Sequence, residues 1–227
     1  MTPPRTALVT GANRGIGLAT ARALHYAGWR VVLTARDRDA ARTAAAGTGP
    51  RAVGLPLDVT LPESVAAARA AAGPVDALVS NAGVLLDAGF DPLTVPADLV
   101  RATLDVNVLG AWRVCQAFVP DMVRAGWGRV VLLSSGTGTF THGLFPGAPG
   151  YALSKTAVNG LTTLLATTTR GSGVLVNAVN PGPTRTRMMP DAGGTVRRAA
   201  DDVVHALGLP DDGPTGVLFR SGRIAGW

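Results

Sequence analysis

Two residues in the second half of the chain are spaced for acid–base chemistry. Tyr151 and Lys155 stand four positions apart where the sequence predicts a helix, so their side chains share one face. A phenol has a pKa of about 10, and a neighbouring ammonium favours the phenolate and lowers that pKa. Lys155 is the only lysine among 21 basic residues, and unlike the rigid arginine fork it is a compact charge on a flexible stem that can donate to several acceptors at once. The pair predicts Tyr151 as a proton donor tuned by Lys155, the alternative being a surface pair without a role.

A glycine-rich turn near the N-terminus predicts a phosphate site. The sequence Thr10-Gly-Ala-Asn-Arg-Gly-Ile-Gly17 joins a short apolar run to a helical pattern. Glycines let the backbone turn sharply and approach a pyrophosphate, which then lies at the positive end of the helix. The residues expected to hold a dinucleotide here are Gly11, Asn13, Arg14, Gly15, Ile16 and Gly17.

The residue after the second expected strand should meet the adenosine ribose. Arg36 occupies this place, and an arginine pairs with a 2′-phosphate, whereas an acidic side chain accepts hydrogen bonds from a free 2′-hydroxyl. Asp37 comes one residue later and could serve as that acid. We therefore expect NADP(H) as the cofactor, with NAD(H) as the less favoured alternative.

Hydroxyl side chains follow the apolar run 129–133. One of Ser134 and Ser135 can donate a hydrogen bond to a substrate oxygen and stabilise the charge that develops there. Thr137 and Thr139 follow closely, so Ser134, Thr137 and Thr139 remain alternatives to Ser135.

Turn residues follow other expected strands, at the ends where open α/β sheets hold ligands. Asp58 ends the third strand, and residues 81–83 end the fourth. After the sixth, Pro181 and Gly182 set a rigid turn suited to a carboxamide, and Thr186 can bond a cofactor near its nicotinamide end.

Short apolar runs alternate with helical patterns along the chain, which predicts a parallel sheet built from βαβ units. The expected strands are Ala7–Thr10, Val31–Ala35, Val53–Leu57, Ala77–Ser80, Arg129–Leu133, Val174–Val179 and Gly216–Phe219. The expected helices are Ile16–Ala27, Arg38–Ala46, Pro62–Ala72, Ala97–Ala125, Tyr151–Arg170 and Val196–Leu207. The predicted fold class is α/β, a doubly wound Rossmann-type fold with a seven-stranded parallel sheet and helices on both faces.

Composition excludes several other classes of protein. At 227 residues, 47% of them hydrophobic, the chain is expected to form one domain over residues 1–227, with cofactor and substrate sites in one unit. No leader pattern and no run of about 18 apolar residues occurs, so we expect a cytoplasmic protein without membrane contact. Cys115 is the only cysteine, and we expect no disulfide and no metal site. The net charge is +6, but the basic residues are dispersed and aromatic residues are few, so no nucleic-acid partner is expected.

Together these motifs resemble the classical short-chain dehydrogenase/reductase family, and especially its carbonyl-reductase-like members, over essentially the whole chain. The glycine turn, the Tyr151–Lys155 pair, the turn at 181–186 and the closing segment 212–220 carry the resemblance. It implies that Ser135 is the active serine. It also implies that Asn107 interrupts a helix and holds the water of a proton relay through Lys155.

The same resemblance implies a set of cofactor contacts. Arg14 would join Arg36 at the 2′-phosphate, and Asp58 with Val59 would contact the adenine. The residues expected beside the adenosine ribose are Asn81, Ala82 and Gly83. Those expected at the nicotinamide ribose and ring are Tyr151, Lys155, Pro181, Gly182, Thr184 and Thr186.

These expectations add up to NADPH-dependent reduction of a small-molecule carbonyl compound, by hydride transfer to the carbonyl carbon and proton donation by Tyr151. A non-catalytic NADP-binding regulator on the same fold is the alternative, and an adenosyl-dependent methyltransferase is a more distant one. The segments 136–150 and 187–197 should form an apolar substrate pocket, in which His142 is read as a loop residue. The resemblance further implies a homodimer or homotetramer formed through the helices expected at 97–125 and 151–170.

Overall fold

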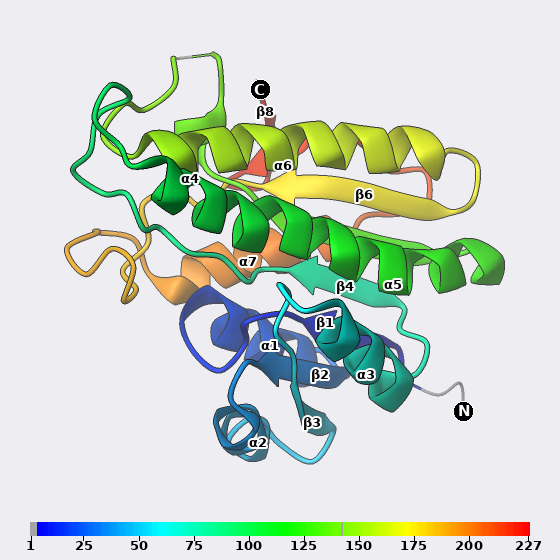
Figure 1. The fold of residues 1–227 in the computed structure, drawn as a ribbon. Helices are drawn as coiled ribbons and strands as arrows, with labels where there is room; N and C mark the ends of the chain where they lie inside the picture. Colours follow the sequence, from blue (N-terminus) through cyan, green and yellow to red (C-terminus); the bar gives the residue numbers. More distant parts are fainter. Residues whose placement is uncertain (1–3, 142) are drawn as a thin grey trace.

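The computed structural model of the protein describes residues 4–141 and 143–227, and its centre is one twisted sheet with helices on both faces (Figure 1). The strand order is β3-β2-β1-β4-β5-β6-β7-β8. The strands are β1 (Thr6–Val9), β2 (Arg30–Ala35), β3 (Ala52–Pro56), β4 (Ala77–Ser80), β5 (Gly128–Leu133), β6 (Val174–Val179), β7 (Leu218–Arg220) and β8 (Arg223–Ala225). The reversal of order at β1 and β4 makes this a doubly wound sheet.

Two apolar cores lie on opposite faces of the sheet. One packs α3, α5 and α6 against it, and the other packs α1, α2 and α7. The helices are α1 (Gly15–Tyr26), α2 (Arg38–Ala46), α3 (Pro62–Ala72), α4 (Ala97–Leu104), α5 (Ala111–Ala125), α6 (Pro149–Thr168) and α7 (Val196–Leu207). The central strands are rich in Val, Leu and Ala and are buried throughout, as expected for strands covered on both faces. Within the described ranges, no helix is both long enough and apolar enough to cross a membrane.

The expected fold class is confirmed, with one more strand than predicted. β8 pairs antiparallel with β7 across a turn at Ser221 and Gly222, whose φ angles are 51° and 69°. Positive φ at two consecutive residues suits a tight hairpin. The strand was missed because Arg223–Ala225 is too short and too polar to stand out as an apolar run. The expected start of the preceding strand at Gly216 was also wrong, because Gly216 has a φ of 75° and lies in the turn before β7.

The helix expected over 97–125 is interrupted. The segment Asp105–Gly110 is a π-helix between α4 and α5, and it contains Asn107. Such π segments place an extra residue in a helix and often occur at functional sites. The interruption that the family resemblance implied at Asn107 is therefore present, whereas apolar periodicity alone predicted one continuous helix.

Candidate active site

A cleft of about 620 Å³ lies at the carboxyl ends of the parallel strands. It brings together the glycine turn, the ends of β2, β3 and β4, and the first turns of α6. The expected residues that line it are Gly11, Asn13, Arg14, Gly15, Ile16, Arg36, Asp58, Val59, Asn81, Ala82, Gly83, Tyr151, Lys155, Pro181 and Thr186. Residues from five separate strand ends thus meet in one place, as the topology of a doubly wound sheet requires.

The glycine turn has the shape and the donors to hold a pyrophosphate. Gly11 and Gly15 have φ angles of 62° and 58°, which favour glycine. Gly17 does not line the cleft but packs beneath the turn, where an added Cβ would lie 2.5 Å from Asn81 Nδ2. Asn81 Nδ2 donates to the carbonyls of Thr10 and Gly11 at 2.8 and 3.1 Å. No side chain caps the start of α1, and its first turn contains no acidic residue, as suits a site for an anion.

Basic side chains gather where the adenosine ribose is expected. Arg14 and Arg36 line the cleft, and so does Arg22 of α1, which the sequence analysis did not single out. The sequence signal that could have found Arg22 is its place in the helix that follows the glycine turn. Asp37 is engaged elsewhere, because its Oδ1 accepts the amide of Ala40 at 2.6 Å and caps α2. The arrangement favours a negative group over a neutral hydroxyl at this end of the cleft.

Asp58 is held as a carboxylate at the edge of the cleft. Burial raises its pKa, but hydrogen bonds from Thr60 outweigh this, and with Arg36 nearby the net pKa is lowered. The Thr60 hydroxyl and amide donate to Asp58 Oδ1 at 2.7 and 2.9 Å. The carboxylate is therefore oriented by its own turn.

Tyr151 and Lys155 face the cleft from one side of α6. Lys155 Nζ lies 5.4 Å from the centroid of the Tyr151 ring and donates to the carbonyl of Leu133 at 2.7 Å. Burial lowers the pKa of Lys155 to about 8 and raises that of Tyr151 to about 12. We expected Lys155 to lower the pKa of the phenol. In the structure burial dominates, and the hydroxyl that lowers the Tyr151 pKa is that of Ser135.

The four candidate hydroxyls differ in their hydrogen bonds, and of Ser134 and Ser135 only Ser134 is among the residues that line the cleft. Ser134 Oγ donates to Asn159 Oδ1 at 2.5 Å, and Thr139 Oγ1 donates to the carbonyl of Gly136 at 3.0 Å. Ser135 Oγ accepts from the amide and the hydroxyl of Thr137, at 3.2 and 3.0 Å. With its lone pairs engaged, the Ser135 hydroxyl keeps its own proton available for a nearby oxygen.

Asn107 lies near this centre without lining the cleft. Its Oδ1 accepts the amide of Val84 at 2.8 Å, and its Nδ2 donates to the Val84 carbonyl and to Ser154 Oγ, both at 2.9 Å. A Cβ added at Gly83 would lie 3.2 Å from Asn107 Oδ1 and 3.8 Å from Lys155 Nζ, so the three residues are neighbours. The side chain is satisfied within the protein, and its part in a proton relay stays a prediction.

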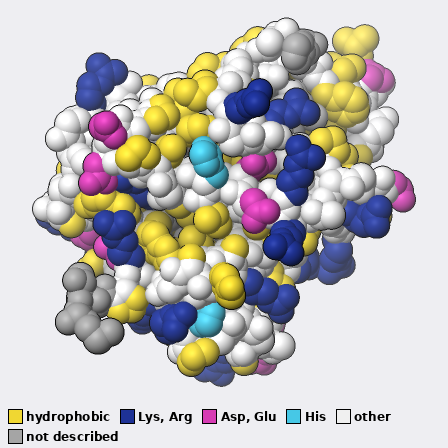
Figure 2. Space-filling view, turned by 180° about the vertical axis from the view of Figure 1, so that it is seen from behind, with side chains coloured by type: hydrophobic (Ala, Val, Ile, Leu, Met, Phe, Trp, Pro, Cys, Tyr) yellow, Lys and Arg dark blue, Asp and Glu magenta, His cyan; other side chains and the backbone are white. Residues whose placement is uncertain are grey.

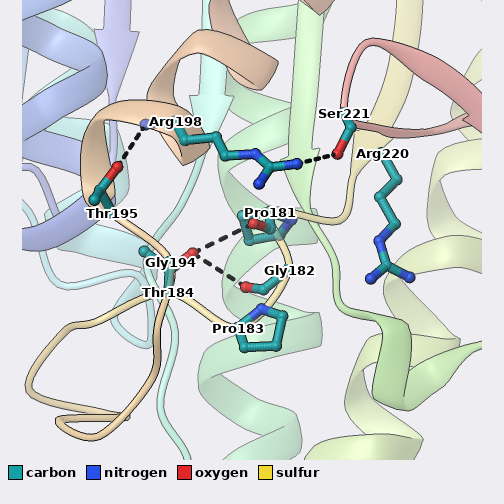
Figure 3. Close-up of a pocket in the computed structure, with 9 residues that line it drawn as sticks. All are labelled: Pro181, Gly182, Pro183, Thr184, Gly194, Thr195, Arg198, Arg220 and Ser221. Atoms are coloured by element: carbon teal, nitrogen blue, oxygen red, sulfur yellow. Dashed lines mark hydrogen bonds between the residues drawn. The ribbon is translucent and has the colours of Figure 1, made fainter.

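The turn at 181–186 is divided between two cavities. Pro181 and Thr186 line the main cleft. Gly182 and Thr184 line a smaller cavity of about 90 Å³, to which Arg198 and Arg220 also contribute (Figure 3). Thr184 Oγ1 points back onto its own loop and donates to the carbonyls of Pro181 and Gly182, at 3.3 and 3.1 Å. The structure thus brings Pro181 and Thr186 to the cofactor side, and uses the Thr184 hydroxyl to hold the turn.

The two segments expected to form the substrate pocket carry exposed apolar side chains, of which Met188 lines the cleft. Phe140, Phe145, Met188 and Met189 are exposed, and Leu144 is half-buried, while His142 lies outside the described residues.

Basic side chains are scattered over the face drawn in Figure 2, with acidic and uncharged ones between them. In the described part of the chain, no group of three or more His, Cys, Asp or Glu residues is placed to hold a metal ion.

Comparison with known proteins shows which family the chain is similar to. Residues 5–195 match the short chain dehydrogenase family. Oxidoreductase UcpA of Escherichia coli (strain K12) is 39% identical over 190 residues, which cover 81% of this chain and 71% of that protein. The NADPH-dependent aldehyde reductase-like protein of Arabidopsis thaliana, described as chloroplastic, is 35% identical over 206 residues, covering 82% and 75%. A solved short chain dehydrogenase/reductase family protein superposes with a TM-score of 0.87 at 32% identity, covering 95% of this chain and 94% of its own. The chain therefore belongs to the short-chain dehydrogenase family of oxidoreductases.

Proposed function

We propose that this protein is an NADP(H)-dependent oxidoreductase that interconverts a small carbonyl compound and its alcohol, with Tyr151 as the proton donor. The observation that carries the proposal is that Tyr151 and Lys155 line the same cleft as the glycine turn. A bound nicotinamide dinucleotide would supply the hydride. The site and the cofactor-binding turn would then form one unit within residues 1–227.

The roles of the chain's own residues follow from their contacts. Ser135, whose oxygen accepts from Thr137, would donate a hydrogen bond to the substrate oxygen, without transferring its proton, and hold that oxygen beside Tyr151. Tyr151 would then give its proton to that oxygen as negative charge develops. Lys155, whose Nζ is hydrogen-bonded to the Leu133 carbonyl, would donate its other hydrogen bonds to the ribose. When the lysine is charged, it would also lower the pKa of the phenol. Asn107 would maintain the polar path behind Lys155.

Preference for NADP(H) rests on the basic end of the cleft. Arg14 and Arg36 both line it, and guanidinium groups bind phosphate oxygens by charge-assisted hydrogen bonds. The acid that NAD(H) would need at this place, Asp37, caps α2. The Arabidopsis relative's description as NADPH-dependent also supports this assignment.

Exchange of one side chain tests the cofactor preference. We expect Arg36→Glu to weaken NADPH binding by about 10-fold or more, because a charge-assisted pair becomes a repulsion, and to improve the use of NADH. Fluorescence titrations with NADPH and NADH measure both affinities, and Arg38→Glu on the same surface is the control. An unchanged ratio of the two affinities would remove the argument for NADP(H).

A substrate panel tests the reaction itself. Aldehydes, ketones and quinones are mixed with the protein and NADPH, and consumption of NADPH is followed. We expect turnover with at least one apolar carbonyl class, because Met188 lines the cleft and other apolar side chains of the segments 136–150 and 187–197 are exposed. Tight NADPH binding with no turnover on any of them would instead favour the non-catalytic regulator.

We also propose a cytoplasmic homo-oligomer. Exposed apolar side chains lie on the π segment and α5 and on α6, and a second copy would cover them. They are Leu109, Trp112, Val123, Leu153 and Leu164. The sole cysteine, Cys115, is buried and unpaired, which suits a reducing compartment.

A further inference from the structure

A buried carboxylate outside the proposed catalytic set lies against the helix that carries Tyr151. Asp87, in the segment between β4 and α4, has an exposed fraction of 0%. Its Oδ2 accepts the amide of Gly150 at 2.5 Å, and both of its oxygens lie 3.3 Å from the amide nitrogen of Tyr151. A charge this deeply buried needs compensation, and these amides provide it.

The start of α6 has no cap of its own. Its N-cap residue is Ala148, whose side chain cannot accept a hydrogen bond, and no acidic residue occurs in the first turn. Pro149 has no amide proton, and the amide of Ala152 is already bonded to the carbonyl of Ala148 at 2.9 Å. The two free amides of this turn are therefore those of Gly150 and Tyr151, and Asp87 binds both.

The surroundings are shaped for this contact. A Cβ added at Gly150 would lie 3.0 Å from Asp87 Oδ2 and 3.2 Å from Val100 Cα of α4, so a larger residue would crowd the carboxylate. A second bond joins the same two segments, because the amide of Gly89 donates to the carbonyl of Gly147 at 2.9 Å. Residues 87–89 thus hold the entry to α6 on both sides of its first residue.

We propose that Asp87 is a positioning residue for Tyr151: its buried carboxylate fixes the first turn of α6 and so holds the phenol in line with Ser135 and Lys155. This inference rests on the proposed function, because it gives Tyr151 its catalytic part. First turns of helices fray readily, and a displacement of about 1 Å at a reacting group can cost about 100-fold in rate. The hydrogen bonds from the amides of Gly150 and Tyr151 to Asp87, here called the clamp, remove that freedom at Tyr151.

Amide hydrogen exchange tests the clamp without using activity. We expect Asp87→Ala to speed exchange at Gly150 and Tyr151 by about 10-fold or more, and Asp87→Asn, which keeps one acceptor oxygen, to have a smaller effect. Asp202→Asn is the matched control. Asp202, in α7, is also a buried carboxylate, and it accepts a hydrogen bond from the amide of Ser221 in the turn between β7 and β8. Unchanged exchange at both amides in Asp87→Ala would overturn the proposal.

Kinetics test the consequence for catalysis. We expect kcat to fall in the order wild type, Asp87→Asn, Asp87→Ala, by about 10- to 100-fold in the last, with the Kd for NADPH unchanged.

The outcomes separate this inference from the function it rests on. Values of kcat equal to that of wild type in both Asp87 variants would refute the positioning role. Full turnover by Tyr151→Phe would refute the proposed function instead, and the exchange rates at Gly150 and Tyr151 would still report whether the clamp exists.

Discussion

Burial sets the acid–base properties of the two central side chains. Lys155 is 5% exposed, and desolvation lowers its pKa from 10.5 to about 8. Desolvation acts on Tyr151 in the opposite sense, because its charged form is the deprotonated one. Both groups are therefore held closer to their neutral forms than they would be in water, and each can lose or gain charge in response to a ligand in the cleft.

The shifted lysine has a consequence for stability. Between pH 8 and about 10.5 the unfolded chain keeps a proton on Lys155 that the folded protein has released, so the free energy of unfolding rises with pH in this window. Relative to Lys155→Met, which has no such group, wild type should gain about 2 kcal/mol between pH 8 and 10. Urea unfolding of both proteins at several pH values measures the difference. Below pH 8 both states hold the proton, so the two curves should run parallel there. Parallel curves over the whole range would show that the lysine is not desolvated.

At the residue scale, features that depend on local spacing could be predicted from the sequence, whereas features that depend on contacts between distant residues could not. Tyr151 and Lys155 could be paired from sequence because a separation of four in a helix fixes their shared face. Spacing did not choose among the hydroxyls of 134–139, because the choice depends on how the loop folds back on itself, and Ser135 was named only from the family resemblance. Asp87 gave no signal, since the amides it binds lie 63 and 64 residues away.

At the scale of elements, close packing between a loop and a helix aligns the proposed catalytic groups. Gly138 follows Ser135 in a short 3-10 turn, and an added Cβ would lie 2.6 Å from the amide nitrogen of Thr156 and 2.7 Å from Lys155 Cβ. The Gly138 carbonyl accepts from Thr156 Oγ1 at 3.0 Å. The turn that carries Ser135 thus rests directly on α6.

A methyl group at this contact should separate the loop from the helix. We expect Gly138→Ala to lower kcat by about 10-fold or more and stability by about 1–3 kcal/mol, because neither backbone can yield without displacing a proposed catalytic side chain. Steady-state kinetics and thermal unfolding measure the two effects. Gly47→Ala, at an exposed helix end with no atom closer than 3.5 Å to the added Cβ, should change neither by a measurable amount. Full activity in Gly138→Ala would show that the contact is not required.

The bounds of α2, α3, α7, β4 and β6 agree with those predicted, because apolar runs and helix signals such as Pro62 mark them locally. The π segment and β8 were not predicted from pattern. The first depends on contacts of Asn107 with Val84 and Ser154, and the second on a hairpin of only three residues a strand. Short or irregular elements are determined by tertiary contacts that periodicity does not carry.

Over the whole molecule, one end of the sheet forms the cleft and the other end contains a cluster of polar contacts around a buried arginine. The carboxyl ends of the strands form the cleft, while the opposite end contains the buried Arg129 at the start of β5. Its guanidinium donates to the carbonyls of Gly128 and Leu209, and to Asp211 Oδ1 at 2.5 Å. It also lies 4.4 Å from the centre of the Trp127 ring. This cluster ties the loop after α7 to the sheet, far from the proposed chemistry.

Stability and activity should therefore respond separately to changes at the two ends. We expect Arg129→Leu to lower the free energy of unfolding by about 3 kcal/mol, because several buried carbonyls lose their donor, with kcat and the Kd for NADPH unchanged at 25 °C. Denaturant unfolding and kinetics on the same preparation measure both. A loss of kcat equal to the loss in Gly138→Ala would show that the two ends are coupled.

The central claim is that the phenol of Tyr151 delivers a proton within the cleft that binds the dinucleotide. Tyr151→Phe removes only that hydroxyl, and Tyr26→Phe, at a tyrosine with an exposed fraction of 92%, is the matched control. NADPH fluorescence and carbonyl turnover are measured on both variants. The account predicts that Tyr151→Phe lowers kcat by about 100-fold or more while the Kd for NADPH stays within about 3-fold of wild type, and that Tyr26→Phe changes neither. Turnover by Tyr151→Phe at the wild-type rate would contradict it.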